Sequence, residues 1–316
     1  VAARLARTPW GGQLWVMINT SHLAFGTMQC GGRADAAQSM AMFHACYDAG
    51  IRHFDTAWIY TDGASETLLG EFARGHDIQI ATKVGYTGGS GRANLTAQFD
   101  TSRKRLGRDG VDLLYLHRFD PKTPLAETLE LLAEWQSRGM IARIGLSNFA
   151  AWQVMKAQAV AASFGTRIEA IQPMYSLVKR QAEVELLPMV ADQGITAYTY
   201  SPLGGGLLTG KYAAGGAGRL TEDSRYAARY GRSEMAVAAE GLARLAEDLG
   251  THPATLAVAW AKSHPARPVP LISARETGQL APSLAAADYP MTAETYARIA
   301  ALYPAPPPAT DRTEEA

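Results

Sequence analysis

The sequence predicts an α/β fold, a single (β/α)8 TIM barrel with an N-terminal hairpin and C-terminal helices. Eight short apolar runs alternate with longer stretches of helical periodicity, and strands that alternate with helices favour a parallel sheet. The eight units span roughly 250 residues, the usual length of a closed barrel, whereas a doubly wound sheet fits fewer units better. No change in composition marks a second domain, so one domain is expected over residues 1–316.

Each predicted unit begins with a buried strand and continues with a helix. The strands are expected at residues 22–27, 51–55, 78–83, 112–117, 142–147, 168–172, 196–201 and 269–273. Glycine is a typical helix stop, and Gly50, Gly139 and Gly194 follow the helical patterns of the first, fourth and sixth units. The seventh unit has a long loop and helices near 235–249 and 254–262, and the eighth unit ends in a pair of helices.

The two ends of the chain lie outside this repeat. The stretch QLWVMIN, residues 13–19, is expected to form a hairpin that plugs the bottom of the barrel. The tail PAPPPATDRTEEA is rich in proline and charge, so disorder is expected from about residue 304. The first residues, VAARLARTPW, lack the apolar core of a signal peptide.

The composition is that of an ordinary globular chain, with 47% hydrophobic and 19% charged residues. Lys+Arg and Asp+Glu both number 30, so no broad surface for nucleic acid or for an anionic membrane is expected. Only two cysteines occur, Cys30 and Cys46, which argues against a disulfide scaffold and fits a reducing compartment. Since no long apolar run suggests a membrane span either, a cytoplasmic protein is expected.

Polar or ionisable residues follow seven of the predicted strands. In a parallel barrel the chemistry lies where the strands end. The residues at these ends are Asp55, Lys83, His117, Ser147 with Asn148, Gln172, Tyr200 with Ser201, and Ser273 with Arg275. One polar ending is what any strand shows on reaching water, but seven endings with residue types suited to acid–base work favour an active site.

Asp55, Tyr60, Lys83 and His117 come from three successive strand ends. Tyrosine titrates near pH 10 and is a poor acid at neutral pH, but a nearby ammonium lowers its pKa. Lys83 is expected to supply that charge and Asp55 to fix the lysine, while His117 donates to, or orients, the same substrate oxygen. Each residue alone also has a plain structural interpretation, so the hypothesis depends on the set.

Several segments together resemble the aldo-keto reductase superfamily over almost the whole chain. The matching segments are GIRHFDTAWIY with SETLLGEFA, IATKVG, KRLGRDGVDLLYLHRFD, IARIGLSNF, IQPMYSL and YSPLGGGLLTGKY. The last segment is more similar to the branches with aflatoxin-aldehyde reductases, potassium-channel β subunits and bacterial general-stress members than to the aldose reductase branch. The resemblance implies that Asp55, Tyr60, Lys83 and His117 form a catalytic tetrad.

The resemblance also implies NADPH, extended across the mouth of the barrel. Tyr200 would stack under the nicotinamide, residues 201–211 would wrap the pyrophosphate, and Arg275 would face the 2′-phosphate. The cofactor-binding residues implied are Gly26, Thr27, Asp55, Ser147, Asn148, Gln172, Tyr200, Ser201, Leu203, Gly205, Lys211, Ser273, Arg275, Gln279 and Ser283. The family commonly has glycine and asparagine where this chain has Ser273 and Ser283, and Pro282 is unusual.

Two other kinds of site are not expected. Residues 205–211 read G-x-x-x-x-G-K, but Tyr212 replaces the Ser or Thr that a P-loop needs for Mg²⁺. No His, Cys or carboxylate cluster has convincing metal-ligand spacing.

Around the tetrad, Trp58, Tyr60 and His117 are expected to line the substrate pocket. Arg118 is expected either to face its mouth or to pair with Asp120. The loop after Lys211 is expected to close over the cofactor.

The leading hypothesis is an NADPH-dependent oxidoreductase that reduces an aldehyde or ketone to an alcohol by hydride transfer, with Tyr60 as proton donor. One alternative is a redox-sensing subunit that binds the cofactor but turns over little. Another is a sugar or pyridoxal-type alcohol dehydrogenase that uses the same site in reverse. The expected partner is a small carbonyl compound, and the sequence leaves the oligomeric state open.

Overall fold

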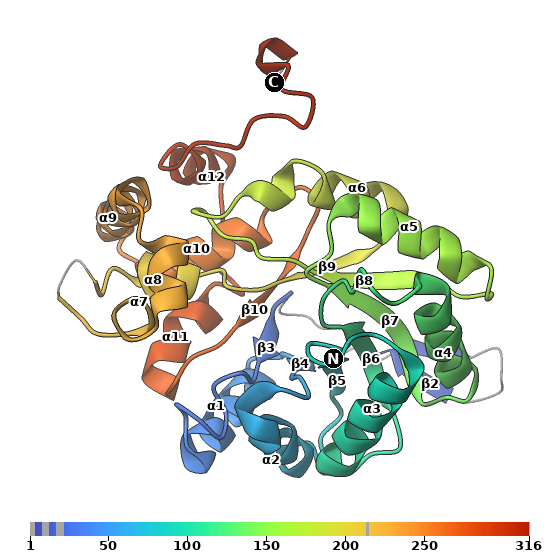
Figure 1. The fold of residues 1–316 in the computed structure, drawn as a ribbon. Helices are drawn as coiled ribbons and strands as arrows, with labels where there is room; N and C mark the ends of the chain where they lie inside the picture. The colour runs from blue at the N-terminus through green and yellow to red at the C-terminus, as the bar shows by residue number, and fades with distance from the viewer. Residues whose placement is uncertain (1–3, 8–12, 17–21, 213–214, 316) are drawn as a thin grey trace.

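The computed structural model describes residues 4–7, 13–16, 22–212 and 215–315. In this part of the chain eight parallel strands form a closed barrel in the order β10-β3-β4-β5-β6-β7-β8-β9, with helices around it (Figure 1). The barrel strands are β3 (Ala24–Gly26), β4 (His53–Asp55), β5 (Gln79–Val84), β6 (Val111–Leu116), β7 (Ile141–Ser147), β8 (Ile168–Gln172), β9 (Thr196–Thr199) and β10 (Val269–Ile272). The predicted (β/α)8 barrel is confirmed.

One α-helix follows each strand from β3 to β8, preceded after β8 by the 3-10 helix η2 (Gln181–Glu183), and several α-helices follow β9 and β10. The first six are α1 (Ala36–Asp48), α2 (Ala64–Phe72), α3 (Arg92–Leu106), α4 (Leu125–Ser137), α5 (Ala151–Ala162) and α6 (Leu186–Gln193). After β9 come α7 (Arg219–Glu222), α8 (Ser224–Tyr230), α9 (Ser233–Asp248) and α10 (Pro253–Lys262), and after β10 come α11 (Thr277–Ala285) and α12 (Ala293–Ala300). No helix in the described ranges is long and apolar enough to cross a membrane.

The ends of the chain match the predictions in part. β1 (Arg4–Arg7) and β2 (Gln13–Val16) pair as an antiparallel two-stranded sheet, whereas residues 17–19 of the expected hairpin lie outside the described residues. Its role as a plug stays a prediction, as do the domain bounds. Residues 304–312 carry no helix or strand, and the 3-10 helix η4 (Thr313–Glu315) follows them.

The segment after Lys211 contains more regular structure than the predicted loop. It holds the short helices α7 and α8, and the Asp223 side chain begins α8 by accepting a hydrogen bond from the amide of Arg225. This segment lacks an apolar period long enough to predict a helix, so its structure depends on local capping and on contacts with the barrel.

Small and large side chains alternate inside the barrel. Ala24, Ala81 and Ala170 share one buried cluster with Tyr115 and Tyr198. Such alternation fills a barrel interior without voids, so that the strands close tightly beneath the functional face.

Gly145 in β7 gives the Tyr115 ring its space. A Cβ added at Gly145 would overlap this ring. The Gly145→Ala variant should therefore lose about 1–3 kcal/mol of unfolding free energy, the usual effect of overpacking a core. Urea unfolding would measure this loss. Gly278→Ala is the matched control, because no atom lies within 4 Å of its added Cβ, and a comparable loss in both variants would contradict the account.

Candidate active site

The polar residues at the strand ends surround one cavity of about 1090 Å³ on the carboxyl face of the barrel. The cavity reaches from the ends of β3 and β4 to the start of α11, and α7 and α8 border it. Its lining includes these residues expected from the sequence: Gly26, Asp55, Tyr60, His117, Ser147, Asn148, Gln172, Tyr200, Ser201, Leu203, Gly205, Lys211, Ser273, Arg275 and Gln279. Thr27, Trp58, Lys83 and Ser283 do not line it.

A buried ion pair lies at the base of this cavity. Lys83 at the end of β5 is fully buried, and its Nζ pairs with Asp55 Oδ1 and donates to the Thr56 carbonyl oxygen at 2.8 Å. The other oxygen of Asp55 accepts from Gln172 Nε2 at 2.8 Å. Burial raises the pKa of Asp55 and lowers the pKa of Lys83, while the attraction within the pair opposes both shifts. The strands therefore hold an ammonium in place next to the cavity.

Tyr60 begins the 3-10 helix η1 (Tyr60–Gly63), directly above this ion pair. The next two residues, Thr61 and Asp62, have left-handed backbone angles, with φ of 47° and 53°. Thr61 Oγ1 stabilises the turn by donating to the Cys30 carbonyl at 2.9 Å and accepting from the Ser65 amide at 3.0 Å. As a result the Tyr60 ring centroid lies 4.9 Å from Lys83 Nζ.

The pKa of Tyr60 differs from the expectation. Burial, and next the negative charge of Asp55, raises it well above its usual value. The expected net lowering of this pKa is wrong for the structure described, because burial and the Asp55 charge outweigh any effect of the Lys83 ammonium, which is paired with Asp55. Tyr60 consequently keeps its proton at neutral pH.

His117 follows β6 and faces Tyr60. The two rings meet edge to face, with centroids 5.9 Å apart. Burial, and then the charges of Lys83 and Arg118, lower the pKa of His117 to about 3, so the imidazole is neutral at neutral pH. Its buried Nδ1 has no hydrogen-bond partner among the described residues. A neutral imidazole carries one N–H, so Tyr60 and His117 can both donate to one oxygen between them.

Trp58 does not line the cavity, although the sequence predicted that it lines the substrate pocket. Its side chain packs with the main hydrophobic core, while Ile59, Tyr60 and Thr61 line the cavity. Arg105 from α3 lies over the Trp58 ring at 5.8 Å and donates to its carbonyl oxygen at 2.8 Å. The contact with α3 holds Trp58 on the helix side of the barrel.

Thr27 and Ser283 are buried beside the cavity. Thr27 Oγ1 donates to the Asp55 carbonyl at 2.9 Å, so Thr27 supports the strand end from behind. Ser283 lies within α11, and its Oγ has no partner among the described residues. Its neighbour Pro282 lines the cavity instead.

A polar chain crosses the floor of the cavity. Tyr200 OH donates to Asn148 Oδ1 at 2.7 Å, and Asn148 Nδ2 donates to the His117 carbonyl at 2.9 Å and to Ser147 Oγ at 3.1 Å. Ser147 Oγ in turn donates to the Gln172 carbonyl at 3.1 Å. Asn148 has a left-handed backbone, with φ of 58°. These bonds fix amide and hydroxyl groups at one end of the cavity, where they can bind a planar amide.

The other end of the cavity is cationic and glycine-rich. Gly205 in η3 (Gly204–Thr209) has φ of 67°, and an added Cβ would lie 2.8 Å from the Tyr226 ring. Lys211 and Arg275 line this end, and Arg275 pairs with Glu222 of α7 at 2.8 Å. Glycine amides and cations of this kind suit a phosphate group.

Several lining residues were not found from the sequence. The most distinctive are Tyr86 and four residues of α7 and α8, which are Arg219, Arg225, Tyr226 and Arg229. The spacing of the arginines in the segment after Lys211 was the one sequence signal for these residues. It does not show which of them face the cavity, because that depends on how the segment packs against the barrel. No group of three or more His, Cys, Asp or Glu side chains suited to a metal ion occurs among the described residues.

Residues 22–304 match the family model described as the aldo/keto reductase family. Aflatoxin B1 aldehyde reductase member 2 from Rattus norvegicus is 40% identical over 195 residues, which cover 59% of this chain and 53% of that protein. The match thus spans about half the length of that relative. A probable voltage-gated potassium channel subunit beta from Oryza sativa is 31% identical over 93% of this chain and 96% of its own length. The uncharacterized oxidoreductase YrpG from Bacillus subtilis is 31% identical over 92% and 94%.

Proposed function

This chain belongs to the aldo/keto reductase family, and on that premise we propose that it is an NADPH-dependent oxidoreductase that reduces an aldehyde or ketone to an alcohol. The observation that carries the proposal is the arrangement at the cavity floor. Tyr60 and His117 face each other above the buried Lys83–Asp55 pair. Members of this family use nicotinamide cofactors, generally NADPH.

Tyr60 acts as the proton donor in this proposal. The substrate oxygen accepts hydrogen bonds from the Tyr60 hydroxyl and the His117 imidazole. A nicotinamide cofactor, when bound in the cavity, would supply the hydride that the carbonyl carbon accepts. As the oxygen becomes an alkoxide, which is a stronger base than a phenolate, Tyr60 gives it the phenolic proton. Lys83, 4.9 Å from the ring centroid, stabilises the resulting tyrosinate, and Asp55 holds Lys83 in position.

The residues of the cavity fit a dinucleotide. Ser147, Asn148 and Gln172 offer amide and hydroxyl groups for a carboxamide, and Tyr200 offers an aromatic ring. Lys211 and Arg275 lie at the cationic end. Near Arg275, the buried Ser273 Oγ has no hydrogen-bond partner among the described residues, so it is available to a ligand.

Arg275 is proposed to select NADPH over NADH. A charge-assisted contact with the 2′-phosphate is worth roughly 1.5–3 kcal/mol, so Arg275→Ala should weaken NADPH binding about ten- to a hundredfold. NADH lacks this phosphate and should bind nearly as before. Fluorescence titration with both cofactors measures the two affinities.

The control for this titration is Arg244→Ala, which removes an exposed cation of α9 that lies outside the cavity lining. It should leave both affinities unchanged. An equal loss of affinity for NADPH and NADH in Arg275→Ala would mean that Arg275 supports the fold or binds the pyrophosphate. This result would contradict the proposed preference for NADPH.

A second candidate is a nicotinamide-binding regulatory subunit with little turnover. The observation in its favour is the match to the rice protein named as a probable potassium channel subunit, which covers nearly the full length of both chains. Both candidates use the same cavity and differ in turnover. A screen of cofactor consumption, with NADPH and NADH against aldehydes, ketones and sugars, separates them. Tight NADPH binding with no substrate reduced would favour the regulatory subunit.

A further inference from the structure

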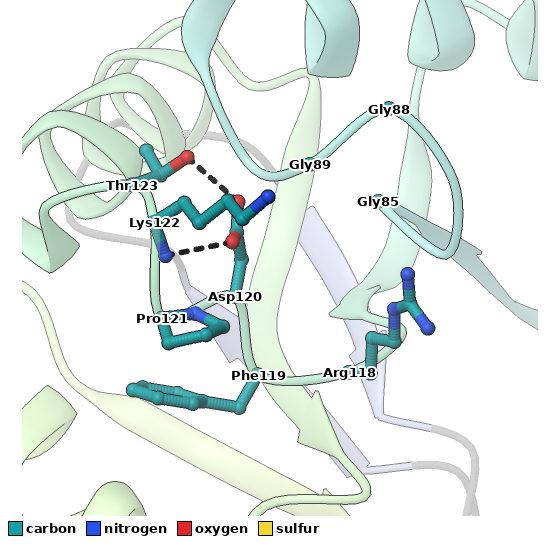
Figure 2. A pocket seen from close by; sticks show the side chains of 9 residues that line it. All are labelled: Gly85, Gly88, Gly89, Arg118, Phe119, Asp120, Pro121, Lys122 and Thr123. Atoms are coloured by element: carbon teal, nitrogen blue, oxygen red, sulfur yellow. Dashed lines mark hydrogen bonds between the residues drawn. The ribbon is translucent and has the colours of Figure 1, made fainter.

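A second cavity has a volume of about 590 Å³ and adjoins the candidate active site at Arg118. Figure 2 shows the residues that line it. It lies between the loop after β5 and the loop after β6. Its lining consists of Gly85, Gly88, Gly89, Arg118, Phe119, Asp120, Pro121, Lys122 and Thr123. Arg118 lines this cavity and the active-site cavity as well, so one side chain borders both spaces.

Arg118 is connected to the catalytic face through Tyr86. The Arg118 guanidinium carbon lies 4.9 Å from the centroid of the Tyr86 ring. The Tyr86 ring in turn lies 4.9 Å from the His117 ring. The Tyr86 ring thus contacts both groups, so an extended substrate whose carbonyl oxygen meets His117 can present its far end to the guanidinium.

The Arg118 guanidinium has no carboxylate within ion-pairing distance among the described residues. The expected alternative, a pair with Asp120, is wrong. Asp120 instead accepts from the amides of Ser90 and Lys122 and from Thr123 Oγ1 at 2.7–2.9 Å, and Figure 2 shows the last two bonds. The Thr123 hydroxyl and the amides lower the pKa of Asp120, so its charge is already stabilised by donors from its own loop and from the loop after β5. Arg118 therefore takes the other position expected from the sequence and faces the mouth of the active-site cavity.

Apart from the Asp120 carboxylate, whose oxygens already accept three hydrogen bonds, the rest of the lining also favours an anion. Lys122 is exposed and adds a second cation. The amides of Gly88 and Gly89 have no acceptor among the described residues. Both glycines have left-handed backbones, and an added Cβ would approach Asn94 at 2.6 Å or Asp120 at 2.8 Å, so no side chain can cover this loop without strain.

We infer that the second cavity is a distal subsite that binds the anionic group, a carboxylate or a phosphate, of an extended carbonyl substrate. Arg118 is the residue that selects such substrates, because a guanidinium binds these oxyanions through two parallel hydrogen bonds. Phe119 and Pro121 provide an apolar wall for the rest of the substrate. This inference rests on the proposed function, because it assumes that the carbonyl group of the same substrate is reduced at Tyr60 and His117.

The test compares aldehydes of similar size and different charge. 4-Formylbenzoate carries a carboxylate, 4-formylphenyl phosphate carries a phosphate, and methyl 4-formylbenzoate is neutral. The wild-type protein should have a kcat/KM at least about tenfold higher for one of the anions than for the neutral ester, mainly through KM. The anion with the higher kcat/KM relative to the neutral ester shows whether the subsite prefers a carboxylate or a phosphate.

Three variants separate charge from packing. Arg118→Gln should reduce the anion-to-neutral ratio to near one, and Arg118→Lys should retain part of it. Lys156→Gln, at an exposed cation of α5 outside both cavities, should leave the ratio unchanged. A wild-type ratio near one, or a ratio that Arg118→Gln does not change, would overturn the subsite.

Binding of terephthalate, measured by calorimetry, gives a readout that does not require turnover. The wild-type protein should bind it at least about tenfold more tightly than Arg118→Gln does, and equal affinities would overturn the subsite. If methyl 4-formylbenzoate is reduced but no charge preference appears, the proposed function stands and the subsite fails. If no aldehyde is reduced while terephthalate binding depends on Arg118, the proposed function fails and the anion site remains.

Discussion

The Tyr60→Phe variant should reduce aldehydes with a kcat at least about a hundredfold below the wild-type value, the low end of the effect of a lost general acid. The phenylalanine ring keeps the contacts of Tyr60 with His117, so only the acidic hydroxyl is removed. NADPH affinity should hardly change. Steady-state kinetics gives kcat, and fluorescence titration gives the cofactor affinity.

Tyr47→Phe is the matched control, since Tyr47 lies in α1 and outside the cavity lining. It should turn over at the wild-type rate. Near-native turnover in Tyr60→Phe would contradict the assignment of Tyr60 as proton donor, because water alone would then supply the proton as well.

The Lys83→Met variant should lose most of its turnover and several kcal/mol of stability. Methionine keeps an unbranched apolar side chain but removes the ammonium next to Tyr60, so the tyrosinate is no longer stabilised. Asp55 becomes an unpaired carboxylate in a fully buried site, and breaking a buried pair typically costs about 3–5 kcal/mol. Kinetics and urea unfolding measure the two losses.

The loss of stability in Lys83→Met should depend on pH, and the direction of this dependence follows from the pKa of Asp55. Without Lys83, burial raises the pKa of Asp55 against only the hydrogen bond from Gln172, so the folded variant binds a proton that the unfolded chain releases. The stability deficit relative to wild type should therefore shrink as the pH falls from 7 towards 5. A deficit that stays constant over this range would contradict the buried-carboxylate explanation.

Adding Asp55→Asn to Lys83→Met separates stability from catalysis. The double variant no longer buries an unpaired charge and should recover much of the lost stability. It should not recover turnover, because the ammonium is still missing. Recovery of both would show that Lys83 acts only through the fold.

The positions of Asp55, Lys83 and His117 were predictable because parallel strands end at one face of a barrel. The alternation of apolar runs and helical periods determines which residues are the last of each strand. The side chains at these strand ends thus gather for a topological reason, with Asp55 and His117 lining one cavity and Lys83 buried next to it.

The site features that were missed depend on contacts between distant segments. Trp58 leaves the cavity because Arg105, on a later helix, holds it by its ring and its carbonyl oxygen. The pKa of Tyr60 depends on burial and on the Asp55 charge, whereas the sequence suggested only the proximity of Lys83. Glu222 meets Arg275 from the short helix α7, which lacks any apolar period. None of these contacts can be inferred from the spacing of residues along the sequence.

The most direct test of the central claim is the coupled measurement of NADPH oxidation and alcohol formation from methyl 4-formylbenzoate. Wild type and Tyr60→Phe are compared at NADPH concentrations that saturate both. The account predicts one alcohol formed for each NADPH consumed by the wild-type protein and at least about a hundredfold slower formation in the variant. It would be contradicted by equal rates in the two proteins.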